Sequence, residues 1–480
     1  MALPSTPQCT NAFSNIINGK PRSSPIIHNA IDPSTGNPLW DVPVASNEDL
    51  EDAVTSAREA FKSWSTTPWE ERQACLLELR RVLLSYKEEM TELVMTEVGR
   101  PQQFAAAEVD LSADFLLCNA NRSAQQKLIP EVIQEDTNRL LTTHYKPRGI
   151  IAAIIPWNFP LLQVVAKIAA ALVTGNCAIV KPSPFTPYSA LKLAEMAVPV
   201  FPPGVFQALN GDETTGPAMT AHPGIDKVSF SRSTATGKKV LASASSTLKA
   251  CTLELGGNDA AIIYPDVVIK HTAGQVIIGS LYNSGQYCLA SKRIYIHEDI
   301  YTEFVQALVD AVRECKVGPA KEDVMLGPLQ NEMQFNKVKE IWEDCKDHGY
   351  AFALEGGPRA GPGYFFDPVI VDNPPETSRI ATEEQFGPIL PVFTWSDEED
   401  LISRVNNSDN GLGGSVWSTD IPKARGMAGR IEAGSVWINS FPNPLPQCHL
   451  VGWKSSGVGG EWGLQGLKAY CNVQVQHEYR

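Results

Sequence analysis

Between Gly149 and Leu253 the sequence alternates short, mostly apolar segments with longer segments of helical periodicity. The apolar segments are rich in β-branched residues and read GIIAAII, CAIV, VFQAL and KVSF, with a fifth leading into Leu253. Strands that are apolar on both faces belong to parallel sheets covered by helices on each side. The pattern therefore predicts an α/β fold built on a doubly wound, Rossmann-like parallel sheet of about five strands.

Two helical segments precede this sheet. Apolar residues recur at helical spacing from Leu50 to Trp64 behind Ser46, which we expect to be the N-cap. A second periodic run starts at Thr67 and Pro68, a cap residue followed by a proline at the first helical position, and ends at Gly99. We expect both segments to be helices that cover the sheet.

A second alternating block follows Gly256 and Gly257 and continues to about Gly434, with a strand at 260–263 and a helix at 300–317. It predicts a second α/β domain. Two extended segments fit neither block, namely 134–146 and the terminal NVQVQHEY, which alternates apolar and polar residues. Such alternation at a chain end predicts an edge strand that needs a partner, and the simplest partner is another subunit.

Charge and cysteine content exclude several classes of protein. With 54 acidic and 40 basic residues the net charge is −14, which disfavours binding to nucleic acid or to an anionic membrane surface. The ten cysteines contain no CxxC pair, and the eight histidines form no HExxH motif. We therefore expect no disulfide framework and no metal site, and a reducing, cytoplasmic location.

One uncharged run, from 149 to 166, reaches the length of a membrane helix. Pro156 and Pro160 would break such a helix, so a strand, a turn and a buried helix are expected instead. The first twenty residues show neither the basic and apolar regions of a signal peptide nor an Arg-rich amphipathic helix, so no targeting segment is expected there.

Open α/β sheets bind ligands beyond the carboxyl ends of their strands. Four such ends carry unusual residues: 156–160 (PWNFP), 181–184 (KPSP), 231–237 (SRSTATG) and 254–258 (ELGGN). Each residue taken singly has a structural explanation as a turn residue, a cap or a solvated charge. The hydroxyl-rich segment that opens a helix could hold a phosphate, although the standard GxGxxG turn is absent from the sequence.

One cysteine stands in a different context from the other nine. Cys288 lies in SGQYCLA, where Gly285 and Gln286 suggest a turn that exposes the thiol. A thiol needs help to react at neutral pH, and a carboxylate such as Glu254, a nearby cofactor cation or backbone N–H groups could provide it.

The motifs IIPWNFP, KPSPFTP, LELGGND, SGQYCLA, EEQFGPI and GWKSSGVGGEWG stand in this order along the chain. In order and spacing they resemble the signature series of the NAD(P)-dependent aldehyde dehydrogenase superfamily, and the resemblance runs from INGK at Ile17 to the final strand. Glu254 favours the hydrolytic type, because the acylating relatives that transfer to coenzyme A generally lack this base.

The resemblance implies roles for individual residues. Cys288 would be the nucleophile, Glu254 the general base, Asn158 the side-chain donor of the oxyanion hole beside the Cys288 N–H, and Lys167 a supporting lysine. NAD, with NADP possible, would be bound by Ile154, Pro156, Trp157, Lys181, Ser183, Pro184, Arg232, Ser233, Leu255, Gly256, Glu384 and Phe386. The aldehyde would face Phe159, Gln163, Ala166, Tyr287, Leu289, Pro444 and Leu450.

The resemblance also implies an organisation of domains and partners. Residues 1–123 and 148–254 would form a discontinuous dinucleotide-binding domain, 255–465 a catalytic domain, and 124–147 with 466–480 an oligomerisation arm. The partners would be a small-molecule aldehyde and further copies of the chain, in a dimer or a homotetramer. Neither nucleic acid nor membrane is expected as a partner.

Three positions depart from the family pattern. Pro184 stands where a glutamate commonly binds the NAD ribose, a change that is compatible with NADP. Arg232 replaces a glycine, and its side chain would either point to solvent or contact a phosphate. Residues 449–452 (HLVG) replace a proline, an aromatic residue and two glycines, and His449 is expected to be a loop residue rather than a catalytic one.

The mostly apolar lining favours a medium-sized aliphatic or aromatic aldehyde over a dicarboxylic semialdehyde. Two alternatives stay open: an enzyme that transfers the acyl group to coenzyme A, and a dehydrogenase-like binding protein without turnover.

Overall fold

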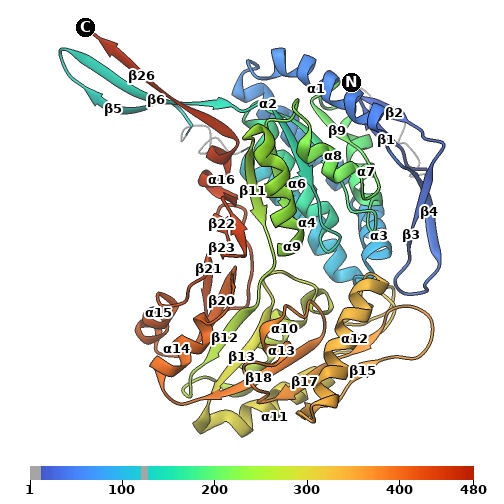
Figure 1. Ribbon diagram of the computed structural model, residues 1–480, viewed down its shortest axis with the longest axis vertical. Helices are drawn as coiled ribbons and strands as arrows, with labels where there is room; N and C mark the ends of the chain where they lie inside the picture. Colours follow the sequence, from blue (N-terminus) through green and yellow to red (C-terminus); the bar gives the residue numbers. More distant parts are fainter. Residues whose placement is uncertain (1–11, 121–127) are drawn as a thin grey trace.

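The computed structural model describes residues 12–120 and 128–480. Residues 1–11 and 121–123 of the predicted dinucleotide-binding domain, Cys9 among them, lie outside the described residues, as do residues 124–127 of the predicted arm. The chain forms two α/β halves, one above the other in Figure 1, and a long β arm that projects from the upper half.

The first sheet contains the predicted parallel strands. Its order is β2-β1-β9-β8-β7-β10-β11-β24, in which β9 to β11 are parallel, while β1 with β2 and β24 add antiparallel edges. The strands are β1 (Asn15–Ile17), β2 (Lys20–Arg22), β7 (Ile150–Ile154), β8 (Cys177–Lys181), β9 (Phe206–Ala208), β10 (Lys227–Ser231), β11 (Ala250–Glu254) and β24 (Gly457–Val458). The strand order reverses between β7 and β10, which is where such sheets bind ligands.

Helices cover both faces of this sheet, as expected for a doubly wound fold (Figure 1). One layer consists of α1 (Asn47–Trp64), α8 (Thr215–Ala221) and α9 (Thr234–Ala244). The other consists of α2 (Trp69–Ser85), α3 (Lys87–Val98), α4 (Gln102–Asn119), α6 (Pro160–Val173) and α7 (Tyr188–Ala197). The Ser46 N-cap is confirmed, because its hydroxyl accepts from Asp49 N and the Asp49 carboxylate accepts from Ser46 N in return.

The predicted second helix differs from the structure in two ways. The run is two helices, α2 and α3, which meet at Tyr86. Thr67 does not cap it, because its hydroxyl donates to the carbonyl of Ser63 at the end of α1, and Pro68 itself takes the N-cap position. The predicted end is correct, since Gly99 closes α3 in the left-handed region at φ 74°.

The second sheet has the order β14-β17-β18-β13-β12-β20-β21 and is parallel except for β14. Its strands are β12 (Asp259–Ile263), β13 (Ser291–His297), β14 (Ala351–Leu354), β17 (Val369–Asp372), β18 (Ile389–Trp395), β20 (Gly413–Trp417) and β21 (Ser435–Ile438). It extends four residues beyond the predicted limit at Gly434, because β21 completes its edge.

The helices of this half are α10 (Ile269–Leu281), α11 (Tyr301–Arg313), α12 (Glu332–Asp347), α13 (Arg379–Thr382), α14 (Glu398–Asn406) and α15 (Ile421–Ala428). The helix expected at 300–317 is α11, which ends earlier, at Arg313. Separate apolar clusters lie on the two faces of the sheet, one beneath α10 and α11 and the other beneath α14 and α15.

The two unassigned extended segments form one sheet. β6 (Arg139–Pro147) pairs antiparallel with β26 (Cys471–Tyr479) along its whole length and with β5 (Glu131–Glu135) on its other side. The expectation that the terminal strand pairs first with another subunit is therefore wrong, since its partner is β6 of the same chain. The alternating pattern predicts an exposed strand but does not specify its neighbour, and the outer edge of β26 pairs with no other strand of the described residues.

Short strands complete the fold. β3 (Ile27–Ile31) pairs with β4 (Pro38–Pro43), β15 (Gly357–Pro358) with β16 (Phe366–Asp367), β19 (Asn410–Gly411) with β23 (Trp453–Lys454), and β22 (Leu450–Val451) with β25 (Gly460–Glu461). Helix α16 (Gly463–Ala469) leads from β25 into β26.

Three of the expected absences can be compared with the structure. Residues 149–166 contain β7, a turn and the first part of α6, and no helix in the described part of the chain is long and apolar enough to cross a membrane. The nine cysteines of the described residues are free, and no group of three or more His, Cys, Asp or Glu side chains within 12–120 and 128–480 could hold a metal ion.

Candidate active site

The residues chosen at the strand ends meet at the switch point of the first sheet. Asn158 follows β7, Arg232 follows β10, and Glu254 is the last residue of β11. The register places Ile154 beside both Lys181 and Phe230, and Ser231 beside Glu254, so that four strand ends form one edge. The expected convergence is therefore found in the structure.

Cys288 is delivered to this edge from the second half by a tight turn. The turn at Tyr282–Gly285 contains Asn283 and Ser284 in the left-handed region, at φ 54° and 56°. Gly285 follows at φ 76°, and a Cβ there would lie 2.3 Å from the carbonyl oxygen of Gly387. This position accepts only glycine without rearrangement. The expected turn is present, and the Cys288 side chain is half-buried.

The Cys288 thiol contacts a carboxylate. Its Sγ donates to Oε1 of Glu254 at 3.4 Å. The other carboxylate oxygen, Oε2, accepts from the Ser231 hydroxyl at 3.0 Å and from the Gln163 amide at 3.4 Å. Three donors therefore fix the carboxylate beside the sulfur. Gln163, chosen as a substrate-facing residue, thus holds Glu254 while it also lines the cavity above Cys288.

Burial perturbs both members of this pair. Burial raises the pKa of Glu254, and the ammonium group of Lys167 offsets part of the effect. Burial also raises the pKa of the Cys288 thiol well above its usual value, and the nearby Glu254 charge raises it further. The resting sulfur is therefore a protonated thiol, hydrogen-bonded to a carboxylate that is a stronger base than an exposed glutamate. Such a pair can move a proton between sulfur, carboxylate and a bound molecule.

Asn158, the third residue of the site beside Cys288 and Glu254, is held by several hydrogen bonds. Its Nδ2 donates to the Gln286 carbonyl at 3.1 Å, and its own carbonyl accepts from the Asn283 amide and from Arg100. Arg100 is fully buried and paired with Glu108. Sequence reasoning missed Arg100 and Glu108, because no motif marks the segment between α3 and α4 that carries the arginine.

Lys167 lies one layer behind the site. Its Nζ donates to both carboxylate oxygens of Glu461 at 2.9 Å and to the Ser229 hydroxyl at 3.0 Å. Both side chains of the ion pair are almost completely buried. The contacts of the ammonium are thus with Glu461 rather than with the oxyanion position, and it acts on the site through its effect on the pKa of Glu254.

A cavity of about 260 Å³ lies above Cys288, Glu254 and Asn158. Many of the residues assigned to the cofactor line it: Pro156, Trp157, Arg232, Ser233, Leu255, Gly256, Glu384 and Phe386. The Trp157 and Phe386 rings meet edge to face at 5.3 Å, and a Cβ on Gly256 would lie 2.4 Å from Glu384. Sequence reasoning missed three further lining residues, Met333, Gln334 and Lys337, all on α12.

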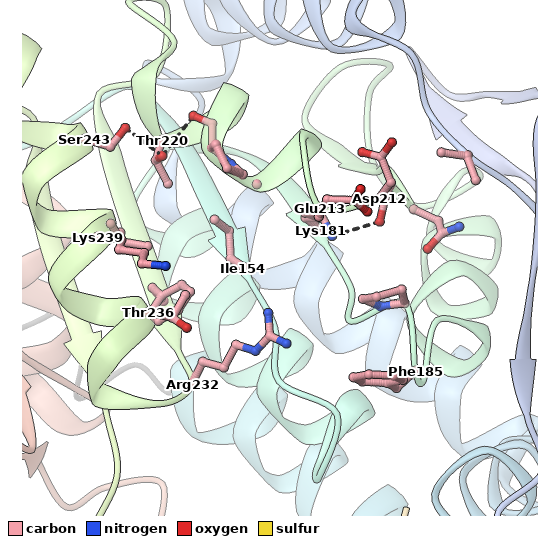
Figure 2. A pocket seen from close by; sticks show the side chains of 18 of the residues that line it. Ile154, Lys181, Phe185, Asp212, Glu213, Thr220, Arg232, Thr236, Lys239 and Ser243 are labelled. Carbon is pink, nitrogen blue, oxygen red and sulfur yellow. Dashed lines mark hydrogen bonds between the residues drawn. The ribbon is translucent and has the colours of Figure 1, made fainter. Parts of the chain in front are cut away.

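A larger cavity of about 470 Å³ adjoins the first and shares Arg232 and Thr236 with it. Ile154, Lys181 and Pro184 line it, and Figure 2 shows the Arg232 side chain extending into it. This favours the second of the two orientations considered for Arg232. Its guanidinium has no hydrogen-bonded partner among the described side chains and carbonyls.

The larger cavity is suited to an anionic ligand with hydroxyl groups. Lys181 is buried and donates to the Gly211 carbonyl at 3.1 Å, and burial together with the Arg232 charge lowers its pKa to about 8. Ser233 precedes α9 and its side chain does not cap the helix, so no side-chain cap occupies the N–H groups of the first turn. Ser183 contributes differently, because its hydroxyl accepts from the Phe185 N–H and it lines neither cavity.

The residues assigned to the aldehyde separate into three groups. Leu289, Pro444 and Leu450 line a third cavity of about 230 Å³, whose other walls include Trp437, Leu445, His449 and Trp462. Gln163 lines the cavity above Cys288. Phe159, Ala166 and Tyr287 are buried and line none of the three cavities.

Aromatic packing accounts for the position of two of these residues. The Phe159 and Tyr287 rings lie 5.4 Å apart, with the Arg100 guanidinium 4.1 Å from the Phe159 ring. This packing supports the Asn158 turn and the Cys288 turn from behind.

Comparison with known proteins agrees with this geometry. The model of the aldehyde dehydrogenase family matches residues 22–476. The chain is 41% identical over 470 residues to a putative aldehyde dehydrogenase, FUS7, of Gibberella fujikuroi, which covers 98% of this chain and 99% of that protein. It is 42% identical to the aldehyde dehydrogenase LUC3 of a Fusarium species, with the same coverage of both chains.

Solved structures share the fold. An aldehyde dehydrogenase variant from Bacillus cereus superimposes with a TM-score of 0.94 at 32% identity, over 97% of this chain and 96% of that chain. Betaine aldehyde dehydrogenase from Staphylococcus aureus, solved in complex with NAD+, superimposes with a TM-score of 0.93 at 31% identity, over 97% and 94% of the two chains.

Proposed function

The chain belongs to the aldehyde dehydrogenase family, whose members oxidise aldehydes, and we propose that it converts a small-molecule aldehyde to the free carboxylic acid through Cys288. The observation that carries this proposal is the hydrogen bond from the Cys288 thiol to Glu254, 3.4 Å long, in a cavity that Asn158 also lines. Nucleophile, base and oxyanion donor then act on one bound carbonyl group.

In the first step the Cys288 sulfur bonds to the carbonyl carbon and the thiol proton passes to Glu254. The carbonyl oxygen becomes an oxyanion in a thiohemiacetal. One N–H of the Asn158 side-chain amide donates to the Gln286 carbonyl, and this hydrogen bond orients the amide. The second N–H of the amide and the backbone N–H of Cys288 then both donate to the oxyanion. Because Arg100 and Asn283 fix the Asn158 backbone, the donor needs little reorganisation during the reaction.

When bound, NAD or NADP would supply the hydride acceptor that the Cys288 adduct needs to pass from a thiohemiacetal to a thioester. We assign its adenosine end to the larger cavity with Lys181, its pyrophosphate to Ser233 and the start of α9, and its nicotinamide end to Glu384 and Phe386. The positive charges of Lys181 and Arg232 in the larger cavity and the N-terminus of α9, which has no side-chain cap, support this assignment.

Hydrolysis completes the cycle. After Glu254 has released the thiol proton to solvent, it takes a proton from a water molecule, whose oxygen attacks the thioester carbon; the Cys288 thiolate leaves and recovers that proton from Glu254 as the acid departs. The raised pKa of Glu254 suits this task, since a base works best when its pKa lies near the working pH. Ser231 and Gln163 hold the carboxylate in position through both steps.

Cofactor preference depends on Arg232 and Pro184 in this proposal. Pro184 brings no carboxylate to the larger cavity, whereas Lys181 and Arg232 bring positive charge. Both NAD and NADP fit this environment, and we assign the Arg232 guanidinium to a phosphate group of either one.

The third cavity supports an uncharged substrate. Leu289, Pro444, Leu445, Leu450 and the two tryptophans give it mostly apolar walls. Leu289 lines it while the adjacent Cys288 lines the cavity that contains Glu254, so neighbouring residues face the two spaces. We therefore propose a medium-sized aliphatic or aromatic aldehyde rather than a dicarboxylic semialdehyde.

For the assembly we propose a cytoplasmic dimer or tetramer. In this scheme residues 1–123 and 148–254 bind the dinucleotide, 255–465 carry the nucleophile, and 124–147 with 466–480 form the arm between subunits. Exposed apolar side chains on the arm, such as Val132, Val473 and Val475, support a contact with another copy. A reducing compartment would keep Cys288 a free thiol.

The test is a panel of aldehydes with NAD and with NADP, followed by the absorbance of the reduced nicotinamide, with and without coenzyme A. The proposal expects turnover without coenzyme A on apolar aldehydes and the free acid as product. A strict requirement for coenzyme A would identify an acylating enzyme instead. Folded protein that is silent across the panel would favour a binding protein without turnover.

A further inference from the structure

Lys292 is a buried cation next to the nucleophile. It lies in β13, four residues after Cys288, and its side chain is only 3% exposed. Its Nζ donates to the Cys288 carbonyl at 2.8 Å and to the Ala290 carbonyl at 3.5 Å. An ammonium group so deeply buried needs strong partners, because the cost of removing it from water is several kcal/mol.

The same ammonium group connects Cys288 to a carboxylate of the cofactor-facing cavity. Glu384 Oε1 lies 3.3 Å from Lys292 Nζ and accepts from the Gly257 N–H at 3.1 Å. A Cβ on Gly257 would lie 2.5 Å from the Cys288 carbonyl oxygen, so the two backbones are in direct contact. Lys292 and Glu384 together therefore join three segments that are distant in sequence: the loop after β11, the Cys288 turn and the loop after α13.

Several titratable groups surround the thiol. Glu254 from β11 and Glu384 from the loop after α13 raise the pKa of Cys288, and Lys292 from β13 lowers it. The neighbouring Tyr287 hydroxyl stays protonated, since burial raises its pKa well above the usual value. Asp259 of β12 is also close to Lys292. Burial raises the pKa of Asp259 to about 7, and the Lys292 charge offsets part of this rise.

We propose that Lys292 is a positioning residue for the nucleophile: it fixes the Cys288 carbonyl against Glu384, and its charge stabilises the thiolate once the proton has left. Lys292 does not touch the reacting atoms and acts through the Cys288 main chain and through its electrostatic field. The proposal depends on Cys288 being the nucleophile of the proposed function, while Lys292 itself stands outside the motif residues assigned above.

The test measures how fast iodoacetamide alkylates Cys288 as a function of pH in protein without cofactor or aldehyde, with peptide mass spectrometry to follow this cysteine alone. Lys292→Met removes the charge at similar length, and we expect the pKa of Cys288 to rise and alkylation at pH 8 to slow about tenfold. Lys292→Arg keeps the charge and should restore most of the rate. Lys339→Met, on the exposed face of α12, is the matched control and should match the wild type.

A second variant should change the alkylation rate of Cys288 in the opposite direction. Glu384→Gln leaves Lys292 in place and removes its counterion, so alkylation at pH 7 should become faster than in the wild type. A role of Lys292 in folding alone would change thermal stability without moving the pH profile. If Lys292→Met does not fold, Lys292→Gln decides, because it can still donate to the Cys288 carbonyl but carries no charge: slower alkylation at pH 8 supports the proposal.

An unchanged profile in folded Lys292→Met or Lys292→Gln, or unchanged or slower alkylation in Glu384→Gln, overturns it. Since alkylation needs no turnover, these results stay distinct from a failure of the proposed aldehyde oxidation.

Discussion

Replacing Glu254 with glutamine separates the two halves of the proposed reaction. The substitution preserves size and removes the charge that faces Cys288 Sγ at 3.4 Å. The Ser231 hydroxyl, 3.0 Å from Oε2, can still donate to the amide oxygen, so the side chain should keep its position. Glu254→Gln therefore changes the proton chemistry of the site with little change in its packing.

The two steps should respond differently. The Glu254 charge raises the pKa of Cys288, so its loss makes the thiolate easier to form, and with solvent in place of Glu254 as the proton acceptor the first step survives above neutral pH. Hydrolysis loses its base, which contributes about 100- to 10,000-fold in rate. This corresponds to about 3 to 5 kcal/mol of barrier, so the thioester step should become limiting.

Stopped-flow absorbance of reduced nicotinamide measures both steps at once. We expect a burst that approaches one reduced cofactor per Cys288, followed by a steady state at least about 100-fold slower than in the wild type. Gln163→Asn, which changes one of the donors to Glu254, is a useful comparison and should reduce turnover less. Normal turnover in Glu254→Gln would refute the assignment, and so would a burst that slows by the same factor as the steady state.

Four other predictions follow from the same geometry. Asn158→Ala should slow the burst itself about 100- to 1,000-fold, because it removes an oxyanion donor, and burst rates at saturating cofactor check this. Lys167→Met should lower the free energy of unfolding by about 3 to 5 kcal/mol, because it leaves Glu461 buried without its partner; thermal unfolding measures the loss, and adding Glu461→Leu should recover most of it. Arg232→Gly should weaken cofactor binding about 10- to 100-fold if the guanidinium holds a phosphate, and unchanged kcat/KM for both NAD and NADP would leave that contact unsupported. Because Lys181 has a pKa of about 8, it loses its charge as pH rises through 8, so cofactor Kd should increase about fivefold between pH 7 and pH 9, and Lys181→Gln should abolish that dependence.

The parallel strands were predictable because each carries its own local signal. β7 is apolar on both faces and β8 is apolar up to Lys181, and the interior of a covered sheet suits such segments; β10 alternates Val228 and Phe230 with polar residues, yet it is buried at every position. The antiparallel edge strand β24 was not predictable, since two residues of GV become a strand only through pairing with β11. The break between α2 and α3 at Tyr86 was missed for a similar reason, because neither proline nor glycine marks it.

The candidate site was predictable where strand ends carry motifs and unpredictable where its support comes from distant segments. Asn158 follows a recognisable strand and Glu254 ends another, so both side chains could be expected at the same edge of the sheet. Arg100 and Lys292 have the residue types of exposed positions, and only the fold reveals that both are buried beside the Asn158 and Cys288 turns. Long-range ion pairs leave no periodic signal in a sequence.

Apolar residues near the substrate were the least predictable. Phe159 and Tyr287 are residue types that often line pockets, yet here they are buried and pack against each other behind the Asn158 and Cys288 turns. A side chain that is apolar fits the core and a cavity wall equally well, so its type alone cannot decide between them.

The central claim is that Cys288 carries an acyl group whose release depends on Glu254. Mass spectrometry of the intact Glu254→Gln protein, after mixing with the oxidised cofactor and a substrate aldehyde, measures this intermediate directly. We expect the mass of the protein to increase by the mass of the aldehyde minus two hydrogen atoms, with the added group on the peptide that contains Cys288. The wild type should contain little of this species. An acyl group on another cysteine, or none during active cofactor reduction, would contradict it.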